Sequence, residues 1–436
     1  MSGYNDDIIV GIDLGEEMTY ISFGVVQGNM VTTVASSQEE RYGIPTVMCY
    51  DRDKDKWAFG GQAAQIAAEN KDVLYSSLLN DAVRDSVNHV PGQETAPDSI
   101  RRLKVFIAHC MELAAAAAGK KSVYEPIIAL SIAVRYLDEN VLKTLDWAIS
   151  SIRGEIKLVR FMTYSECFFY YTMNQPPEIW RKSVLLLDYN KDVFKKSILR
   201  VNARSTPSIV RIEEGDITEM PPFDEANLEE SDRTLTELLQ GKIDSPLANE
   251  VFNSSSVYLS GLNFEGDWGK DFIKFLCNGR RVFQGQNLYT KGACYGAREM
   301  LVGGYVSQKF FFLGQDKLRC NIGIRMMSGG LEVIKDIVDA GINWYDLHYE
   351  EDVMLGKDKD ICLVLNSITG GDERNCIIRL DDIPDRQVRS CRLHLVFSMK
   401  SPGVLNVRII DRGLGELIPA SGTVIQEEIN IYESER

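Results

Sequence analysis

The chain has 436 residues, which is too long for one compact core, so two or three folded units are expected. Its formal net charge of −15 at pH 7 argues against a basic groove for nucleic acid, and an anionic membrane surface would repel it. Neither nucleic acid nor membrane is therefore expected as a partner.

The cysteines and the N-terminal residues indicate the cellular compartment in which the protein is expected. There are nine cysteines, an odd number, and no C-x-x-C pair, and several lie in apolar strand-like runs. They are typical of small buried side chains in a reducing cytosol. The start, MSGYNDDIIV, lacks the pattern of a secretory signal, and no apolar run approaches a membrane span. The sequence therefore predicts a cytoplasmic protein.

The first part of the chain alternates between strand and helix patterns. An apolar run at 8–14 ends in Gly-Ile-Asp-Leu-Gly, and a hairpin follows from residue 18. Further on, the pattern predicts helices at 98–118, 136–153 and 165–173 and strands at 126–134 and 156–162. This alternation indicates an α/β layer.

A second α/β segment follows the Asn-Gln-Pro-Pro of residues 174–182. Strands are predicted at 183–188, 196–202 and 256–261, and a helix at 267–277. The stretch 212–249 is rich in Asp and Glu, which favours a solvated loop with one helix at 232–240.

Beyond residue 310 the apolar pattern changes to period two. Strand-like segments occur at 319–326, 361–367, 376–380, 391–399 and 404–410, and no helix is predicted among them. These features indicate a separate all-β unit.

Three acidic side chains at strand or helix ends are candidates for chemistry. The run IIVGIDLG brings a strand into a glycine turn, where backbone N–H groups can approach a phosphate. Asp13 in this run would either coordinate a metal-bound nucleotide or close the turn. Glu166 would position water or cap a helix, and Asp188 ends a strand and would bind a metal or remain structural.

Several segments, in collinear order, resemble the seventy-kilodalton heat-shock (DnaK-type) chaperones of the actin-like superfamily. VGIDLGEEMTYISFG is similar to their first phosphate loop, and VLLLDYNKDVFKKSIL to their second phosphate strand. MTYSECFFYYT lies where the family has its Asn-Glu-Pro-Thr-Ala-Ala helix, and VYLSGLNFEGDWGKDFIKF resembles the adenosine segment. RLDDIPDRQVRSCRLHLVFSMKSPGVLNVRIIDRGLGE resembles the middle of the peptide-binding β domain.

The resemblance implies an α/β two-lobed actin-like (ribonuclease H-like) ATPase fold plus a C-terminal all-β sandwich. Lobe I would span residues 1–182, a shortened lobe II 183–308, and the sandwich 315–436, without the family's helical lid. The implied catalytic residues are Glu166 and Asp188, and Asp13 would also bind the metal. The implied cofactor-binding residues are Asp13, Gly15, Glu16, Glu17 and Gly261.

Departures from the family pattern put ATP hydrolysis in doubt. Glu16 and Glu17 replace two threonines that face the nucleotide phosphates, and their charges would repel a triphosphate. The second loop reads Asp188-Tyr189-Asn190-Lys191-Asp192-Val193 where the family has three consecutive glycines. Residues 71–90 hold no convincing counterpart of the catalytic lysine.

The sequence therefore predicts a divergent binding or interaction module with a degenerate nucleotide site, a pseudo-ATPase that binds ATP and magnesium weakly or not at all. Its partner is expected to be a protein or peptide held by the β-sandwich, with Trp344 and Tyr345 either as contacts or as packing residues. The alternative is a functional ATP-dependent chaperone with unusual phosphate loops. A sugar or acetate kinase is disfavoured because those folds carry no such sandwich.

Overall fold

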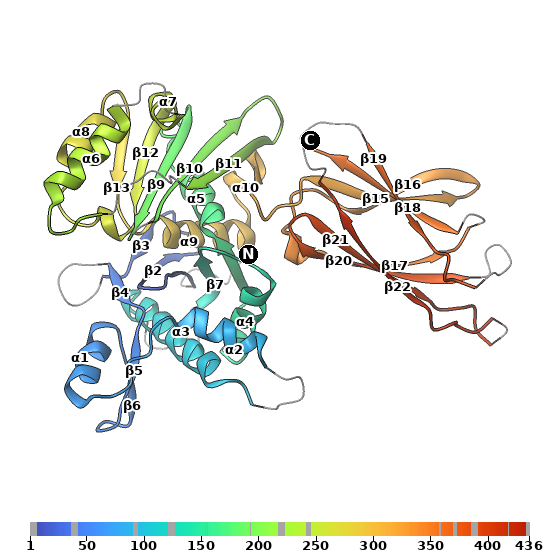
Figure 1. Ribbon diagram of the computed structural model, residues 1–436, viewed down its shortest axis with the longest axis horizontal. Coiled ribbons are helices and arrows are strands. Elements are labelled where there is room, and N and C mark those ends of the chain that lie inside the picture. Colours follow the sequence, from blue (N-terminus) through green and yellow to red (C-terminus); the bar gives the residue numbers. More distant parts are fainter. Residues whose placement is uncertain are drawn as a thin grey trace. The chain divides into compact units, whose positions relative to one another are not determined.

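The computed structural model describes residues 7–35, 42–89, 95–120, 127–152, 154, 156–191, 193–216, 223–240, 246–356, 359–368, 373–384, 391–416 and 418–432. The chain forms two compact units, Met1–Phe311 and Phe312–Arg436 (Figure 1). The division falls a few residues before position 315, where the sequence places the start of the sandwich.

The first sheet of the larger unit combines an antiparallel meander with two parallel strands. Its strands are β1 (Ile8–Leu14), β2 (Met18–Val25), β3 (Val31–Thr33), β4 (Gly43–Pro45), β7 (Ile127–Val134) and β8 (Leu158–Thr163). The order is β3-β2-β1-β7-β8, with β4 paired to β2; β1 runs antiparallel to β2 and parallel to β7. All residues of β1 and β7 are buried, as expected for central strands covered on both faces.

The second sheet repeats this arrangement. Its strands are β9 (Ser183–Asn190), β10 (Val193–Asn202), β11 (Ser208–Asp216), β12 (Ser254–Ser260), β13 (Arg281–Gln284) and β14 (Phe310–Leu313), in the order β13-β12-β9-β10-β11-β14. The hairpin partners β9, β10 and β11 are antiparallel, whereas β12 is parallel to β9 and β13 to β12. Each sheet therefore contains a three-stranded meander extended by two parallel strands, and it carries one further strand, β4 beside β2 or β14 beside β11. The part of the unit built on each sheet is called a lobe below.

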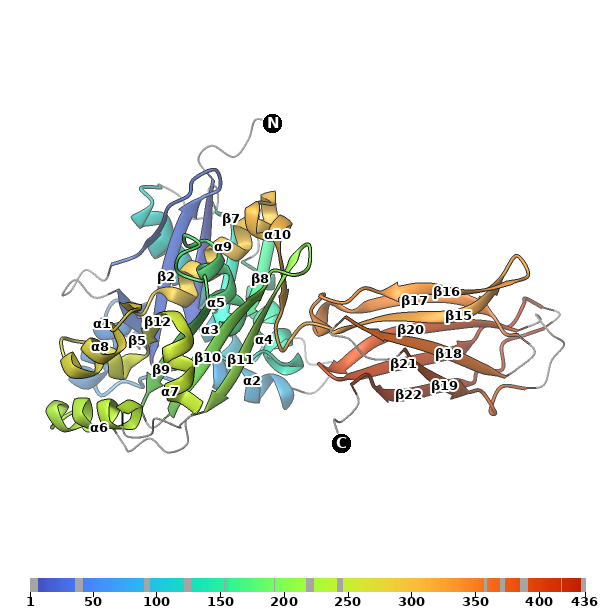
Figure 2. The same cartoon turned by 90° about the horizontal axis from the view of Figure 1, so that it is seen from above.

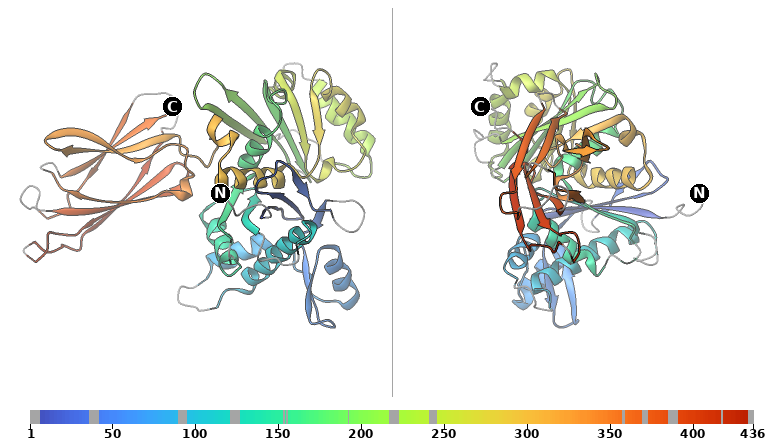
Figure 3. Two further views of the ribbon diagram at one scale, coloured as in Figure 1. Left: turned by 180° about the vertical axis from the view of Figure 1, so that it is seen from behind. Right: turned by 90° about the vertical axis from the view of Figure 1, so that its right-hand side faces the viewer.

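Two helices connect the lobes. Helix α5 (Tyr164–Met173) follows β8 of the first lobe, and its Phe168 ring meets Tyr258 of β12 in the second lobe at 6.2 Å. Helix α9 (Leu288–Val302) follows β13 of the second lobe and packs against β1 and β7 of the first (Figures 1 and 3). The Thr290 hydroxyl of α9 donates to the Gly11 carbonyl at 2.8 Å.

The remaining helices pack on one another, on the sheets or, for α1, on a small hairpin. They are α1 (Gly60–Asn70), α2 (Leu78–Val87), α3 (Asp98–Ala117), α4 (Glu139–Ser150), α6 (Leu228–Gln240), α7 (Pro246–Asn253), α8 (Lys270–Leu276) and α10 (Tyr305–Lys309), together with a small β5 (Met48–Asp51) and β6 (Lys56–Phe59) hairpin and a 3-10 turn at Leu262–Phe264. No helix in the described ranges is long and apolar enough to cross a membrane.

The acidic stretch 212–249 is more ordered than its composition indicates. Its described parts include the end of β11, a turn at 223–227, α6 and the start of α7. Leu235 and Leu239 of α6 are buried in the core of the second lobe. The Asp232 carboxylate accepts the backbone N–H groups of Asp271 and Phe272, at 3.0 and 2.9 Å, at the start of α8. The helix expected at 232–240 is observed as α6. The expectation of a solvated loop is wrong for the parts in β11 and α7, because acidic residues such as Glu213 and Glu214 obscure the apolar alternation of β11.

The second unit is a β-sandwich with its own core (Figure 2). Its strands are β15 (Cys320–Ser328), β16 (Leu331–Val338), β17 (His348–Met354), β18 (Asp360–Ser367), β19 (Arg374–Arg379), β20 (Arg392–Ser401), β21 (Val404–Asp411) and β22 (Val424–Asn430). They form two sheets, β16-β15-β18-β19 and β17-β20-β21-β22. Burial alternates along β20 and β21, so that one face of this sheet supplies the core.

Trp344 belongs to this core and not to an accessible surface. It lies on the 3-10 turn Trp344–Asp346 and is 3% exposed. Its ring meets that of Tyr345, which is half-buried, at 5.6 Å. The idea that Trp344 contacts a partner is therefore corrected, and its packing role holds.

Candidate functional site

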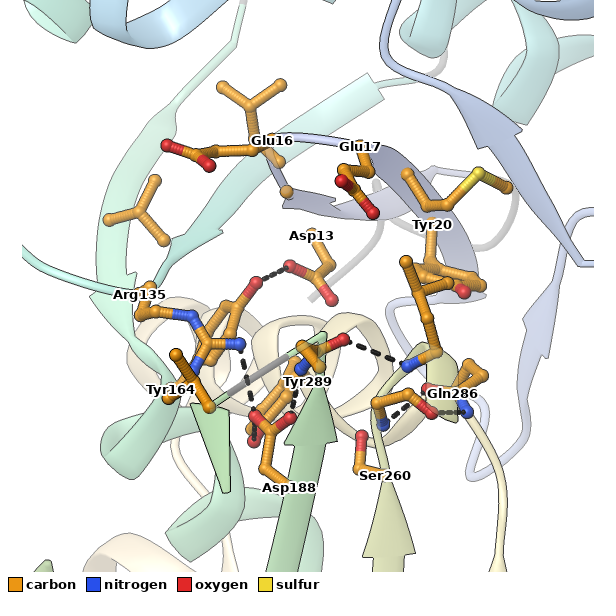
Figure 4. Close-up of a pocket in the computed structure, with 18 of the residues that line it drawn as sticks. Asp13, Glu16, Glu17, Tyr20, Arg135, Tyr164, Asp188, Ser260, Gln286 and Tyr289 are labelled. Atoms are coloured by element: carbon orange, nitrogen blue, oxygen red, sulfur yellow. Dashed lines mark hydrogen bonds and ion pairs between the residues drawn. The ribbon is translucent and has the colours of Figure 1, made fainter. Parts of the chain in front are cut away.

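A cavity of about 440 Å³ lies between the two lobes of the first unit. It opens at the carboxyl ends of β1, β7, β9 and β12, and the first residues of α5 and α9 also line it (Figure 4). Ligands of α/β folds bind outside the carboxyl ends of parallel strands. The cavity is therefore the candidate site of this unit.

Asp13 is buried near the end of β1, the first strand of the first lobe. The Tyr164 hydroxyl donates to its Oδ1 at 2.6 Å. Burial raises the pKa of Asp13 to about 7, against the opposing effects of the Tyr164 hydrogen bond and the Arg135 charge. Near neutral pH this carboxyl group is consequently divided between its protonated and ionised forms.

Asp188 occupies the corresponding place near the end of β9 in the second lobe. It accepts from the Tyr289 hydroxyl at 2.9 Å, pairs with Nη2 of Arg135 at 3.3 Å, and accepts from the Asn190 amide. Burial, followed by the charge of Asp188, raises the pKa of Tyr289 well above its ordinary value, so the phenol remains a donor. Asp188 is thus paired with Arg135 and accepts hydrogen bonds from three side chains.

Two tyrosines and an arginine form the floor of the cavity in Figure 4. The rings of Tyr164 and Tyr289 stack with centroids 3.8 Å apart, and the guanidinium of Arg135 lies 5.1 Å from the Tyr164 centroid. Tyr164 begins α5 of one lobe and Tyr289 lies in the first turn of α9. These side chains therefore join the two lobes directly beneath Asp13.

Hydrogen bonds hold the turn between β9 and β10 to the 3-10 turn at Leu262–Phe264. Asn190 Oδ1 accepts the backbone N–H of Leu262 at 2.9 Å. The Lys191 N–H donates to Asn263 Oδ1 at 3.2 Å, and the Asn263 amide donates back to the Lys191 carbonyl at 2.7 Å. Asp192 of this turn lies outside the described residues.

Gly261 completes this wall of the cavity. Gln286 Oε1 accepts the Gly261 N–H and its Nε2 donates to the Gly261 carbonyl, both at 2.7 Å. The φ of Gly261 is +102°, and a Cβ there would lie 2.3 Å from the Tyr189 carbonyl oxygen. This position therefore requires glycine.

Glu16 and Glu17 lie exposed at the mouth of the cavity (Figure 4). Glu16 accepts from the amide of Asn80 on α2, and Glu17 forms an ion pair with Lys191. The ion pair connects the first loop of one lobe to the corresponding loop of the other.

Most of the residues singled out in the sequence converge here. The cavity lining includes Asp13, Gly15, Glu16, Glu17, Asp188 and Gly261. Glu166 is not part of that lining: it is 2% exposed within α5, and Tyr164, two residues earlier, reaches the cavity instead. The sequence reasoning missed Arg135, Tyr164, Tyr289 and Gln286. Of these four, only Arg135 could have been predicted from the sequence, because it directly follows a fully buried strand and so lies at a strand end.

Comparison with known families divides the chain at nearly the same place as the structure. Residues 29–315, about two thirds of the chain, match the "Family of unknown function (DUF5716) C-terminal", and the chain belongs to that family. Residues 317–431 match a second family, "Domain of unknown function (DUF8552)". No curated protein matches the chain.

Proposed function

We propose that the first unit is an actin-like module, similar in architecture to the lobes of the heat-shock chaperones, that does not hydrolyse ATP. The whole chain then acts as a binding or interaction module. The repeated sheet topology of the two lobes supports the architecture, as does a cavity at the carboxyl ends of their strands.

The state of the two strand-end carboxylates carries the proposal. Magnesium in a nucleotide site needs ionised or otherwise available oxygen ligands in near-octahedral geometry. Asp188 already accepts three hydrogen bonds and faces the Arg135 charge, and burial raises the pKa of Asp13 to about 7. The residues present therefore do not fit a magnesium nucleotide.

The loops are equally unsuited to phosphate. Phosphoryl transfer depends on positioning and on neutralising the charge of the phosphates. Here the turn after Asn190 is held by the side chain of Asn263, and Glu16 adds a negative charge at the mouth. Two unit charges about 4 Å apart interact by ~4 kcal/mol at an effective dielectric of 20, so an unpaired carboxylate opposes phosphate binding substantially.

The β-sandwich supplies a surface for the interaction. Strand β16 is at the edge of its sheet, and the β15–β16 hairpin exposes Met327, Leu331, Val333 and Ile334. An edge strand of this kind accepts an extended peptide as an added strand. Asp336 of the same strand favours a neutral or basic peptide, whereas Glu332 is already paired with Arg325 at 2.7 Å.

A turnover assay tests the proposed loss of hydrolysis. The purified 436-residue chain is incubated with magnesium and ATP, and phosphate release is followed under single-turnover conditions. We expect release no faster than in buffer alone. Turnover that disappears in Asp188→Asn would support the alternative, an ATP-dependent chaperone, and would contradict the proposal.

A further inference from the structure

A second cavity, of about 490 Å³, lies at the opposite end of the second lobe's sheet. Its lining includes residues at the amino ends of β9, β12 and β13, which lie side by side in Figure 1. Four basic residues line it: Arg181, Lys182, Arg280 and Arg281. Glu178 is the acidic residue of the lining.

Two anchored segments bring these basic residues together. Ser255 donates to the Ile179 carbonyl at 2.7 Å and accepts the Lys182 backbone N–H at 3.2 Å, which fixes the segment before β9. Arg280 donates to the carbonyls of Leu276 and Phe275, at 2.9 and 3.2 Å, at the end of α8. The side chains therefore project from a rigid frame and not from a free loop.

The cations of this cavity are not neutralised. Arg181, Lys182 and Arg281 are exposed, and within the described part of the chain their side chains form no hydrogen bond or ion pair. Exposed cations without a partner also occur elsewhere in the described part of the chain, as at Lys56 and Arg379, but here three of them line one cavity. Although acidic residues outnumber basic ones by 63 to 48 in the chain, four basic residues and one acidic residue line this cavity, which gives it a local excess of positive charge.

We propose that this cavity binds a compact ligand bearing a phosphate group. Guanidinium groups match the oxygens of phosphate in a bidentate geometry, and Arg181 and Arg281 contribute one from each segment. The net charge of −15 disfavours extended polyanions, so the ligand is a small phosphate ester or a single phosphorylated side chain. This inference does not depend on whether ATP binds in the cavity between the lobes.

Calorimetric titration of the 436-residue chain with sodium pyrophosphate, and separately with a short phosphoserine peptide, tests the site. We expect at least one probe to bind, and the tighter of the two identifies the source of the phosphate. The double variant Arg181→Gln/Arg281→Gln should weaken binding at least tenfold. The control Lys270→Gln/Lys274→Gln makes the same charge change at exposed lysines of α8 outside the cavity lining, and should change affinity less than twofold.

Cys277 gives an independent readout, because it lines the cavity and is the exposed member of the nine cysteines. Saturating pyrophosphate should slow its alkylation by neutral iodoacetamide at least threefold, measured by peptide mass spectrometry. Alkylation of Cys362, in the β-sandwich, should not change. The proposal is overturned if neither probe binds, or if both double variants weaken binding equally, since the effect would then be one of net charge alone.

Discussion

Asp13 and Asp188 occupy equivalent positions in the two lobes, yet their surroundings give them opposite properties. Asp188 accepts from three donors, one of which is the charged Arg135, whereas Asp13 accepts from the Tyr164 hydroxyl in a buried setting. Desolvation disfavours the ionised form of a carboxyl group, and only sufficient donors or counter-charge offset this. Asp13 is therefore the group whose protonation should change with pH near neutrality in the cavity between the lobes.

Asp13→Asn tests this directly. The folded protein keeps on Asp13 a proton that the unfolded chain releases, because the pKa rises from 3.8 to about 7 on folding. This contribution to stability is complete below the lower pKa and is lost as the pH rises through the higher one. Between pH 5 and pH 8 the unfolding free energy of the wild type should fall by about 3 kcal/mol more than that of Asp13→Asn, measured by urea denaturation.

The matched control is Glu16→Gln, which removes an exposed carboxylate of the same loop. The unfolding free energy of Glu16→Gln should vary with pH in the same way as that of the wild type. Parallel curves for the wild type and Asp13→Asn would show that Asp13 ionises normally in the folded protein, and the argument against metal binding would lose one of its two supports.

At the scale of elements, the two lobes depend on the close contact between α5 and α9. A Cβ at Gly292 of α9 would lie 2.0 Å from the Cys167 carbonyl oxygen of α5, and a Cβ at Gly11 of β1 would lie 2.4 Å from the Thr290 carbonyl oxygen. Both obstacles are backbone atoms, which cannot move aside as a side chain can. These glycines therefore set the distance between the helices and the sheet.

Gly292→Ala should destabilise the protein by at least ~2 kcal/mol, because overpacking against backbone forces a shift of the helix. Gly61→Ala in α1 is the matched control, since a Cβ there has no atom within 4 Å. It should be neutral or stabilising by up to about 1 kcal/mol. Chemical denaturation measures both variants, and equal effects would mean that the contact between α5 and α9 adapts readily.

The sequence predicts the buried elements of this arrangement better than its edges. Strands 8–14 and 126–134 are observed almost as expected, because continuous apolar runs mark central strands. Strand β11 was missed, because Glu213 and Glu214 obscure the alternation of its apolar residues. In the structure Glu213 pairs with Arg200 of the neighbouring β10. The amphipathic helix α2 was not identified within the charged stretch that contains it.

The same limit applies to the site. Asp13 and Asp188 were predicted from local strand-end patterns. Arg135, Tyr164 and Tyr289 come from three segments that meet only after the lobes pack, so no local spacing reveals them. The interpretation of Glu166 was two residues out of register, because the helix begins with Tyr164 and turns Glu166 into the interior.

At the scale of the whole molecule, the chain consists of two units with separate cores. A fragment of residues 315–436 should therefore fold alone, with a β-type circular dichroism spectrum and one cooperative thermal transition. Limited proteolysis of the full chain should cut between about residues 303 and 318. An unfolded fragment, or cleavage only elsewhere, would contradict independent folding of the sandwich.

The central claim is that side chains of the cleft, and not charge at its mouth alone, prevent the binding of magnesium and ATP. The most direct test is a calorimetric titration with ATP, with and without magnesium, of the wild type and of Glu16→Thr/Glu17→Thr. We expect no binding at micromolar concentrations in either protein, because the Arg135–Asp188 pair and the two stacked tyrosines remain in the variant. Micromolar, magnesium-dependent binding of ATP to the wild type would contradict the claim.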